Sequence, residues 1–337
     1  MKKKIITALQ ILATIAILGW LFHDPATRHE MAEALKQANL WWIGAAILVF
    51  AGIEIFAVAR WQVLLKVQGI SLSWMRVAGL MMIGLFFNIF MPGGTGGDVA
   101  KVYYLLKETP GKEPAALLAV LMDRIVGLMA VIVLAGLVFV LRYDWLTQTT
   151  ATSGILWVLI LLFLGSVVSV GGAFVVTTLG WANKLPQKLP LRSKLLELCD
   201  AYHAYGKAWK SSVAAFLLSI PVHLLSFALA YYVAQAFTDA APKVSLWDCM
   251  AIMPIINTLT AVPVTIGGAG AREVLFAQLF GDLCGLSRET ATIVSLATYM
   301  VIVFWGVLGG IVYLFYRSSK RAPEPETAVP VSETEVP

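Results

Sequence analysis

Three pairs of ionisable side chains lie within or beside long apolar stretches of this sequence. Because a charged group in hydrocarbon is costly, each is a candidate for function. Arginine can hold a phosphate through two parallel hydrogen bonds, and lysine adds a compact positive charge. The set therefore predicts a site for an anionic, phosphate-like group. The six residues form three pairs, which are Asp98 with Lys101, Asp123 with Arg124, and Arg272 with Glu273.

The acidic members of these pairs allow two interpretations. They could offset the positive charge of an empty pocket and exchange protons during transport. Alternatively, they could form internal ion pairs that lock helices together. Neighbours in a helix point about 100° apart, so we expect neither Asp123–Arg124 nor Arg272–Glu273 to be satisfied only within itself. Glu54, late in an apolar stretch, is expected to be partly hydrated.

Two clusters of proline and glycine interrupt the apolar pattern and precede two of these pairs. Glycines at such a break remove side chains, so the N–H groups of the following helix can face an anion. The alternative is that the glycines have a structural role only and let helices pack closely. Asn88 and Asn257 precede the clusters, and we expect them to bond freed backbone groups, with ligand contact as the alternative. The candidate binding residues from the clusters are Pro92, Gly93, Gly94, Gly96, Gly97, Gly267, Gly268 and Gly270.

The composition identifies the class of protein that must position these residues. Of the 337 residues, 59% are hydrophobic and only 13% are charged, against about 25% charged in a soluble domain. The mean hydropathy is +0.80. We therefore predict an all-α polytopic membrane protein and exclude a nucleic-acid binder. No cofactor, metal site or catalytic motif is recognisable, so we expect no enzymatic activity.

Six apolar segments are long enough to cross the hydrocarbon core, and two shorter ones are interrupted by proline and glycine. Most of the 25 Lys and Arg residues fall on one side of this arrangement, which the positive-inside rule makes cytoplasmic. The sequence thus predicts a plasma-membrane protein with both termini in the cytoplasm. The expected crossings are residues 5–22, 40–59, 115–141, 154–179, 212–237 and 290–316, and the expected re-entrant hairpins begin with residues 77–91 and 246–262.

The order of segments repeats, because two crossings, a hairpin and a crossing occur twice. Three crossings per half would invert the second half, as in transporters with a central site. We expect one transmembrane domain over residues 1–321, with repeats at about 5–141 and 154–316. Residues 190–210 read as a cytoplasmic amphipathic helix, or as a simple connection, and 322–337 as a disordered tail.

Three segments together resemble the lysylphosphatidylglycerol synthase/flippase transmembrane family. They are NIFMPGGTGGDVAKVYYL at 88–105, DRIVG at 123–127 and PVTIGGAGARE at 263–273. The lead-in EALKQANLWWIGAAIL at 33–48 agrees as well, and the likeness covers about residues 5–316. The family often has a basic residue in the last helix, where this chain has Thr298 and Tyr299.

The resemblance implies a flippase or other lipid-handling membrane protein without a fused aminoacyltransferase domain. Our leading hypothesis is a transporter that moves an anionic phospholipid or polyprenyl-phosphate-type lipid between leaflets. One alternative is a non-transporting partner that presents lipid to a separate synthase or glycosyltransferase. Another is a secondary transporter of a small anionic solute. The sequence leaves the oligomeric state open.

Overall fold

The computed structural model describes residues 36–91, 96–148, 192–237, 242–260 and 270–316, with single positions at 33, 240 and between 154 and 172. Four of the described helices are long and apolar enough to cross a membrane: α3 (Leu40–Val67), α6 (Glu113–Leu141), α10 (Trp209–Ala234) and α13 (Arg288–Phe315). At about 1.5 Å per residue, each exceeds the roughly 30 Å of the hydrocarbon core.

These elements confirm an all-α polytopic membrane protein. Four predicted crossings coincide with these long apolar helices, and the two predicted at 5–22 and 154–179 lie outside the described residues apart from isolated positions. Local sequence fixes two of the helix starts, since the side chain of Asn39 accepts from the Trp41 amide and that of Ser287 from the Thr290 amide. A proline follows the first residue of α6, where no amide donor is needed.

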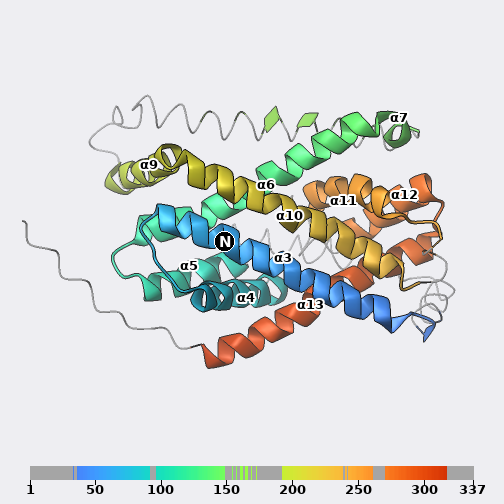
Figure 1. The fold of residues 1–337 in the computed structure, drawn as a ribbon, viewed down its shortest axis with the longest axis horizontal. Coiled ribbons are helices and arrows are strands. Elements are labelled where there is room, and N and C mark those ends of the chain that lie inside the picture. The colour runs from blue at the N-terminus through green and yellow to red at the C-terminus, as the bar shows by residue number, and fades with distance from the viewer. Residues whose placement is uncertain are drawn as a thin grey trace, which may run out of the picture.

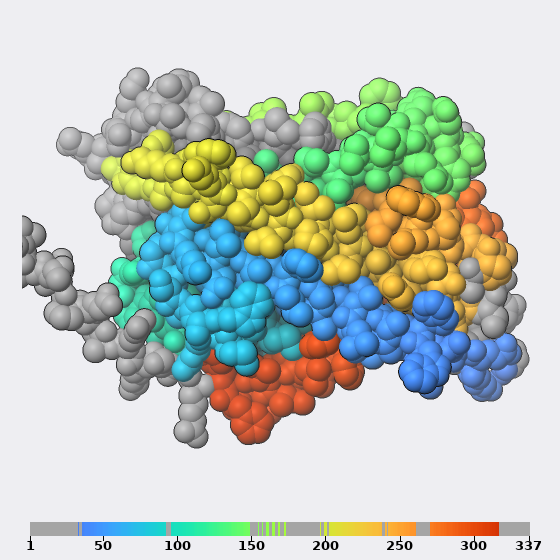
Figure 2. Space-filling model, viewed as in Figure 1, coloured from blue at the N-terminus to red at the C-terminus, as the bar shows by residue number. Residues whose placement is uncertain are grey.

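The long helices α3 and α10 form an antiparallel pair in the middle of the molecule (Figures 1 and 2). At one end, the amide of Asn39 before α3 donates to the carbonyl of Ala236 after α10, at 2.8 Å. At the other end, Tyr205 of α9 (Arg192–Lys207) donates its hydroxyl to the carbonyl of Leu64, at 3.1 Å. These two contacts fix the register of the central pair.

Shorter apolar helices form two hairpins, and these lie toward opposite ends of the bundle (Figure 1). In the first, α4 (Trp74–Phe90) packs against α5 (Gly96–Glu108). In the second, α11 (Leu246–Thr260) packs against α12 (Ala271–Cys284). Both breaks therefore occur where the sequence predicts them. A one-turn helix, α7 (Tyr143–Leu146), follows α6.

Each hairpin packs on the long helix that ends the other half of the chain. Helix α4 contacts α13 extensively, and α11 contacts α6. Glycines permit the first of these contacts, because a Cβ at Gly309 would lie 2.1 Å from the carbonyl oxygen of Met82. A Cβ at Gly306 would likewise meet the side chain of Ile89. Helices α5 and α12 also contact α6 and α13 of their own halves, so each hairpin touches both closing helices. These reciprocal contacts are compatible with an inverted repeat, which stays a prediction.

Candidate functional site

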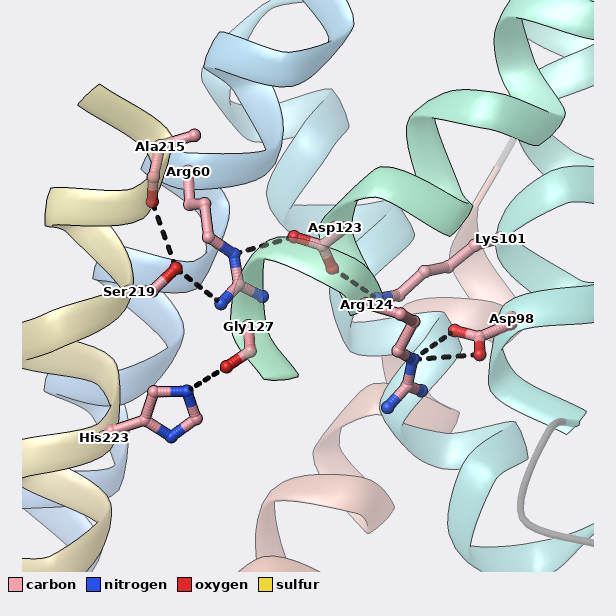
Figure 3. A network of polar contacts seen from close by, with 9 residues as sticks. All are labelled: Arg60, Asp98, Lys101, Asp123, Arg124, Gly127, Ala215, Ser219 and His223. Carbon is pink, nitrogen blue, oxygen red and sulfur yellow. Dashed lines mark hydrogen bonds and ion pairs between the residues drawn. The ribbon is translucent and has the colours of Figure 1, made fainter. Parts of the chain in front are cut away.

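The centre of the polar network is an ion pair between α3 and α6. The Nε of Arg60 lies 2.8 Å from Oδ1 of Asp123, and both side chains are buried (Figure 3). A Cβ at Gly127, one turn after Asp123, would approach the Arg60 guanidinium to 3.2 Å. Gly127 therefore leaves the room that the guanidinium fills between the two helices.

Lys101 reaches the same carboxylate from the re-entrant hairpin. Its Nζ lies 3.8 Å from Oδ2 of Asp123 and 5.4 Å from the centroid of the Trp61 ring. The aliphatic part of Lys101 passes over Gly84 of α4, where any Cβ would lie within 2.6 Å of it. The hairpin is thus shaped to bury this lysine stem and to present its ammonium group to α6.

Arg124 points away from Asp123, as the helical geometry predicts. Its Nε lies 2.9 Å from Oδ2 of Asp98 on α5, and Figure 3 shows the pair at the edge of the network. The Arg124 side chain is 51% exposed. Its two terminal nitrogens have no hydrogen-bond partner among the described residues, so this arginine keeps donors available for a ligand.

Helix α10 supports the network from the opposite side. Ser219 accepts a hydrogen bond from Nη1 of Arg60 at 3.3 Å and donates one to the carbonyl of Ala215 at 3.0 Å. His223 contacts the carbonyl of Gly127 through Nε2 at 2.8 Å. Four helices, α3, α5, α6 and α10, therefore converge on Asp123 and its neighbours.

A second polar group occupies the start of α12. Oε1 of Glu273 is bonded by Arg272 and by the hydroxyl of Ser295, and Oε2 accepts the Gly270 amide at 2.6 Å. The Arg272 guanidinium also lies 4.4 Å above the Tyr299 ring. Arg272 and Glu273 thus bond each other and also groups of α13 and the Gly270 amide, so the pair is not satisfied only within itself.

This arrangement changes the interpretation of the second glycine cluster. The fully buried Glu273 carboxylate accepts the hydrogen bond of the Gly270 amide at the start of α12. An external anion at the N-terminus of this helix would have to compete with Glu273 for that position. Gly270 has a φ of +84°, a conformation that glycine adopts at little cost. No hydrogen bond or ion pair among the described residues joins this group to the network around Asp123.

Close packing accounts for two glycines of the first cluster. A Cβ at Gly97 would lie 2.2 Å from the Gly84 carbonyl oxygen, and one at Gly96 would lie 2.5 Å from Cβ of Met91. The remaining members of both clusters, Pro92, Gly93, Gly94, Gly267 and Gly268, lie outside the described residues. Whether the two tips meet therefore stays a prediction.

The two asparagines make different contacts. Nδ2 of Asn257 donates to the Ser226 hydroxyl at 3.2 Å rather than to backbone. Oδ1 of Asn88 is buried, and no described residue bonds it. Among the described residues, no group of three or more His, Cys, Asp or Glu side chains could hold a metal ion.

Arg60 is not among the site residues predicted from the sequence, because it directly follows the crossing predicted over residues 40–59. Helix α3 instead continues to Val67, and Arg60 lies inside it. A signal was present, because the buried Trp61, Leu64 and Leu65 continue the apolar pattern past the arginine. Such a pattern indicates that the helix does not end at the first charge.

Comparisons with known proteins agree with this architecture. A family model described as "Lysylphosphatidylglycerol synthase TM region" matches residues 6–310. The chain is 23% identical over 339 residues to UPF0104 membrane protein PH1989 of Pyrococcus horikoshii, covering 94% of this chain and 98% of that protein. It is 25% identical over 125 residues to UPF0104 membrane protein MJ1595 of Methanocaldococcus jannaschii, covering 37% and 36% respectively. No solved structure matches it significantly. The chain therefore belongs to the family of lysylphosphatidylglycerol synthase transmembrane regions.

Proposed function

We propose that this protein moves an anionic lipid, of phospholipid or polyprenyl-phosphate type, between membrane leaflets, with the head group bound at Arg124. The observation that carries the proposal is the half-exposed Arg124 guanidinium on a membrane-crossing helix. It lies about 16 Å along α6 from Glu113, well inside the hydrocarbon region. An arginine at that depth is costly unless an anion or water accompanies it.

The surroundings of Arg124 favour a lipid over a soluble anion. Leu117, Leu121 and Leu128 lie seven and three residues before it and four after it, so they share its face of α6. All three are exposed. A phosphate on Arg124 would therefore have an apolar surface beside it on which acyl chains can lie.

The chemistry is recognition and charge compensation. Nε of Arg124 stays with Asp98, while its terminal nitrogens can donate to two phosphate oxygens. Lys101 and Arg60 behind it add positive potential that Asp123 only partly offsets. We further propose that the membrane is the plasma membrane, and that the bundle end carrying Val67, Glu113 and Phe315 faces the cytoplasm.

The proposal is tested in proteoliposomes that contain a fluorescent short-chain phosphatidylglycerol, with dithionite quenching to report its leaflet. Wild-type protein should accelerate translocation, and Arg124→Ala should reduce the rate at least tenfold. Arg142→Ala is the matched control. Arg142 caps the C-terminal end of α6 and is also part-exposed, but it pairs with Asp248 at the end of the bundle. Its rate should equal that of wild type.

Two results would contradict the proposal. Equal rates for wild type and empty liposomes, with co-purification of a lipid synthase or glycosyltransferase, would favour a partner that presents lipid. Uptake of soluble glycerol phosphate in the absence of lipid movement would favour a solute transporter. An unchanged rate in Arg124→Ala would reject the site but not lipid transport itself.

A further inference from the structure

Glu54 is a part-buried acid that the proposed head-group site does not use. It lies in the middle of α3, and its Oε2 is buried with no hydrogen-bond partner among the described residues. The residue as a whole is part-buried. An ionised, unpaired carboxylate in an apolar interior is far more costly than its neutral form. The geometry therefore favours Glu54 in the protonated state when the site is arranged as observed.

The polar atoms around Glu54 belong to the Asp123 network. Trp61 lies seven residues after Glu54, hence on the same face of α3 two turns away. Its Nε1 is also buried without a partner among the described residues, and Lys101 lies over its ring. Lys101, Asp123 and Arg60 all act electrostatically on the Glu54 carboxyl group. The contact of Lys101 with Asp123, at 3.8 Å, is longer than that of Arg60 with Asp123, at 2.8 Å.

The other helices that pack on α3 bring few further charges. Helix α10 contributes His223, whose Nε2 is occupied by the Gly127 carbonyl. In α4 and α13, the charged side chains are Arg76, Arg288 and Glu289, all in the first turn of their helices. Helix α6 adds Arg124 beside Asp123, with Asp98 of α5 as its partner. Glu54 is therefore the acid of this network that lacks a bonded cation.

The charge balance links Glu54 to anion binding. Arg60, Lys101 and Arg124 are positive, and Asp98 and Asp123 are negative. With Glu54 protonated, one positive charge is in excess, and a head-group phosphate can compensate it. With Glu54 ionised, the cluster is neutral and Lys101 has a second carboxylate to attract. Anion binding and protonation of Glu54 must therefore favour each other, since coupling between two sites is reciprocal.

We infer that Glu54 carries a proton that accompanies an anionic head group to Arg124, so that lipid movement is coupled to a proton gradient. This inference rests on the proposed function. The proton is taken from water on one side as an O–H bond of Glu54 and is released to water on the other side. Arg60, Lys101 and Arg124 stay protonated throughout, and no other covalent bond changes.

The first test uses the purified full-length protein and monomeric dihexanoyl phosphatidylglycerol. Calorimetric titrations in two buffers of different ionisation enthalpy give the protons taken up per lipid bound. We expect uptake that approaches one proton at alkaline pH, with affinity falling up to about tenfold per pH unit in that range. Binding without proton uptake would overturn the inference and leave the proposed function intact. Absence of binding at any pH would overturn both.

The second test compares variants in the same titration. Glu54→Gln imitates the protonated acid, so its affinity should be independent of pH and its proton uptake zero. Glu54→Asp keeps a titratable group and should keep the pH dependence. Glu113→Gln, an exposed acid in the first turn of α6, is the control and should behave as wild type. A pH dependence that survives in Glu54→Gln but is lost in His223→Gln would overturn the assignment to Glu54.

In proteoliposomes, the coupled lipid should accumulate in the leaflet that faces the alkaline compartment. Glu54→Gln should move lipid equally in both directions whatever the gradient. Wild-type transport that ignores the gradient would contradict the coupling while supporting the proposed function. Should Glu54→Gln fail to fold, the proton uptake of the wild type decides the question alone.

Discussion

Arg60 and Asp123 are 63 residues apart in the sequence and form a buried ion pair of 2.8 Å between α3 and α6. Lys101 approaches the other carboxylate oxygen from the re-entrant hairpin. One acid therefore joins two membrane-crossing helices and the hairpin between them. The arrangement assigns a structural task to Asp123 and leaves the side chain of the neighbouring Arg124 half-exposed.

Asp123→Asn should destabilise the protein strongly, because it leaves two buried cations without their anion. Removing one member of a buried pair typically costs about 3–5 kcal/mol. The measurement is the free energy of unfolding in detergent. The double variant Arg60→Met, Asp123→Leu removes one cation together with the acid and should recover part of the loss, although Lys101 stays without an anion. Additive losses in the double variant would show that the two side chains do not act as a pair.

Substitutions of Arg124 and Arg272 should have different effects, the first mainly on lipid movement and the second mainly on stability. Arg272→Ala leaves the fully buried Glu273 without its cation, so we expect a loss of about 3–5 kcal/mol. Arg124→Ala removes a half-exposed pair and should cost less stability than Arg272→Ala, while it reduces the rate of lipid movement at least tenfold. Thermal melts and the dithionite assay on the same samples measure both effects. The opposite pattern would place the head-group site at α12.

Asp98→Asn should strengthen binding of the anionic lipid. Asp98 competes with a phosphate for the Arg124 guanidinium, because both carboxylate oxygens of Asp98 accept from its Nε. Affinity for dihexanoyl phosphatidylglycerol should therefore rise up to about fivefold. Calorimetric titration measures the change. Weaker binding in Asp98→Asn would mean that Asp98 orients the arginine more than it competes with the ligand.

Gly309→Ala should destabilise the contact between α13 and α4. The added Cβ would lie 2.1 Å from the backbone carbonyl of Met82, so the helices must separate. Overpacking of this kind costs about 1–3 kcal/mol. Gly136→Ala in α6 is the control, since nothing lies within 4 Å of its added Cβ and alanine favours the helix. Equal melting temperatures for the two variants would show that the α4–α13 contact is not limiting.

Much of the architecture could be predicted from periodicity and from the glycine breaks. The long apolar segments and the two interruptions are visible because hydrocarbon permits few polar or flexible residues. Helix ends were harder to place. The crossing expected to end at residue 59 continues for two further turns to Val67, because buried side chains on one face outweigh the charge of Arg60.

The candidate site could be predicted only in part. Asp98, Lys101, Asp123 and Arg124 do come together, as their short sequence separations suggest. Arg60 and Ser219 join them only through the packing of α3 and α10 on α6, which no local pattern reveals. The angle between neighbouring Cβ atoms did not predict the bond between Arg272 and Glu273, because the arginine chain is long enough to curl back to the adjacent acid.

The contact of α4 with Gly309 restricts how this molecule can change shape. The hairpin α4–α5 comes from the first half of the chain and α13 from the second, yet backbone touches backbone where they meet. A rigid movement of one half past the other would separate the α4 and α13 backbones at this contact. Helix α12 also contacts α13, and α5 is joined to α6 by Lys101 and Asp98. Each hairpin thus links the closing helices of both halves, and any change of shape must preserve these links.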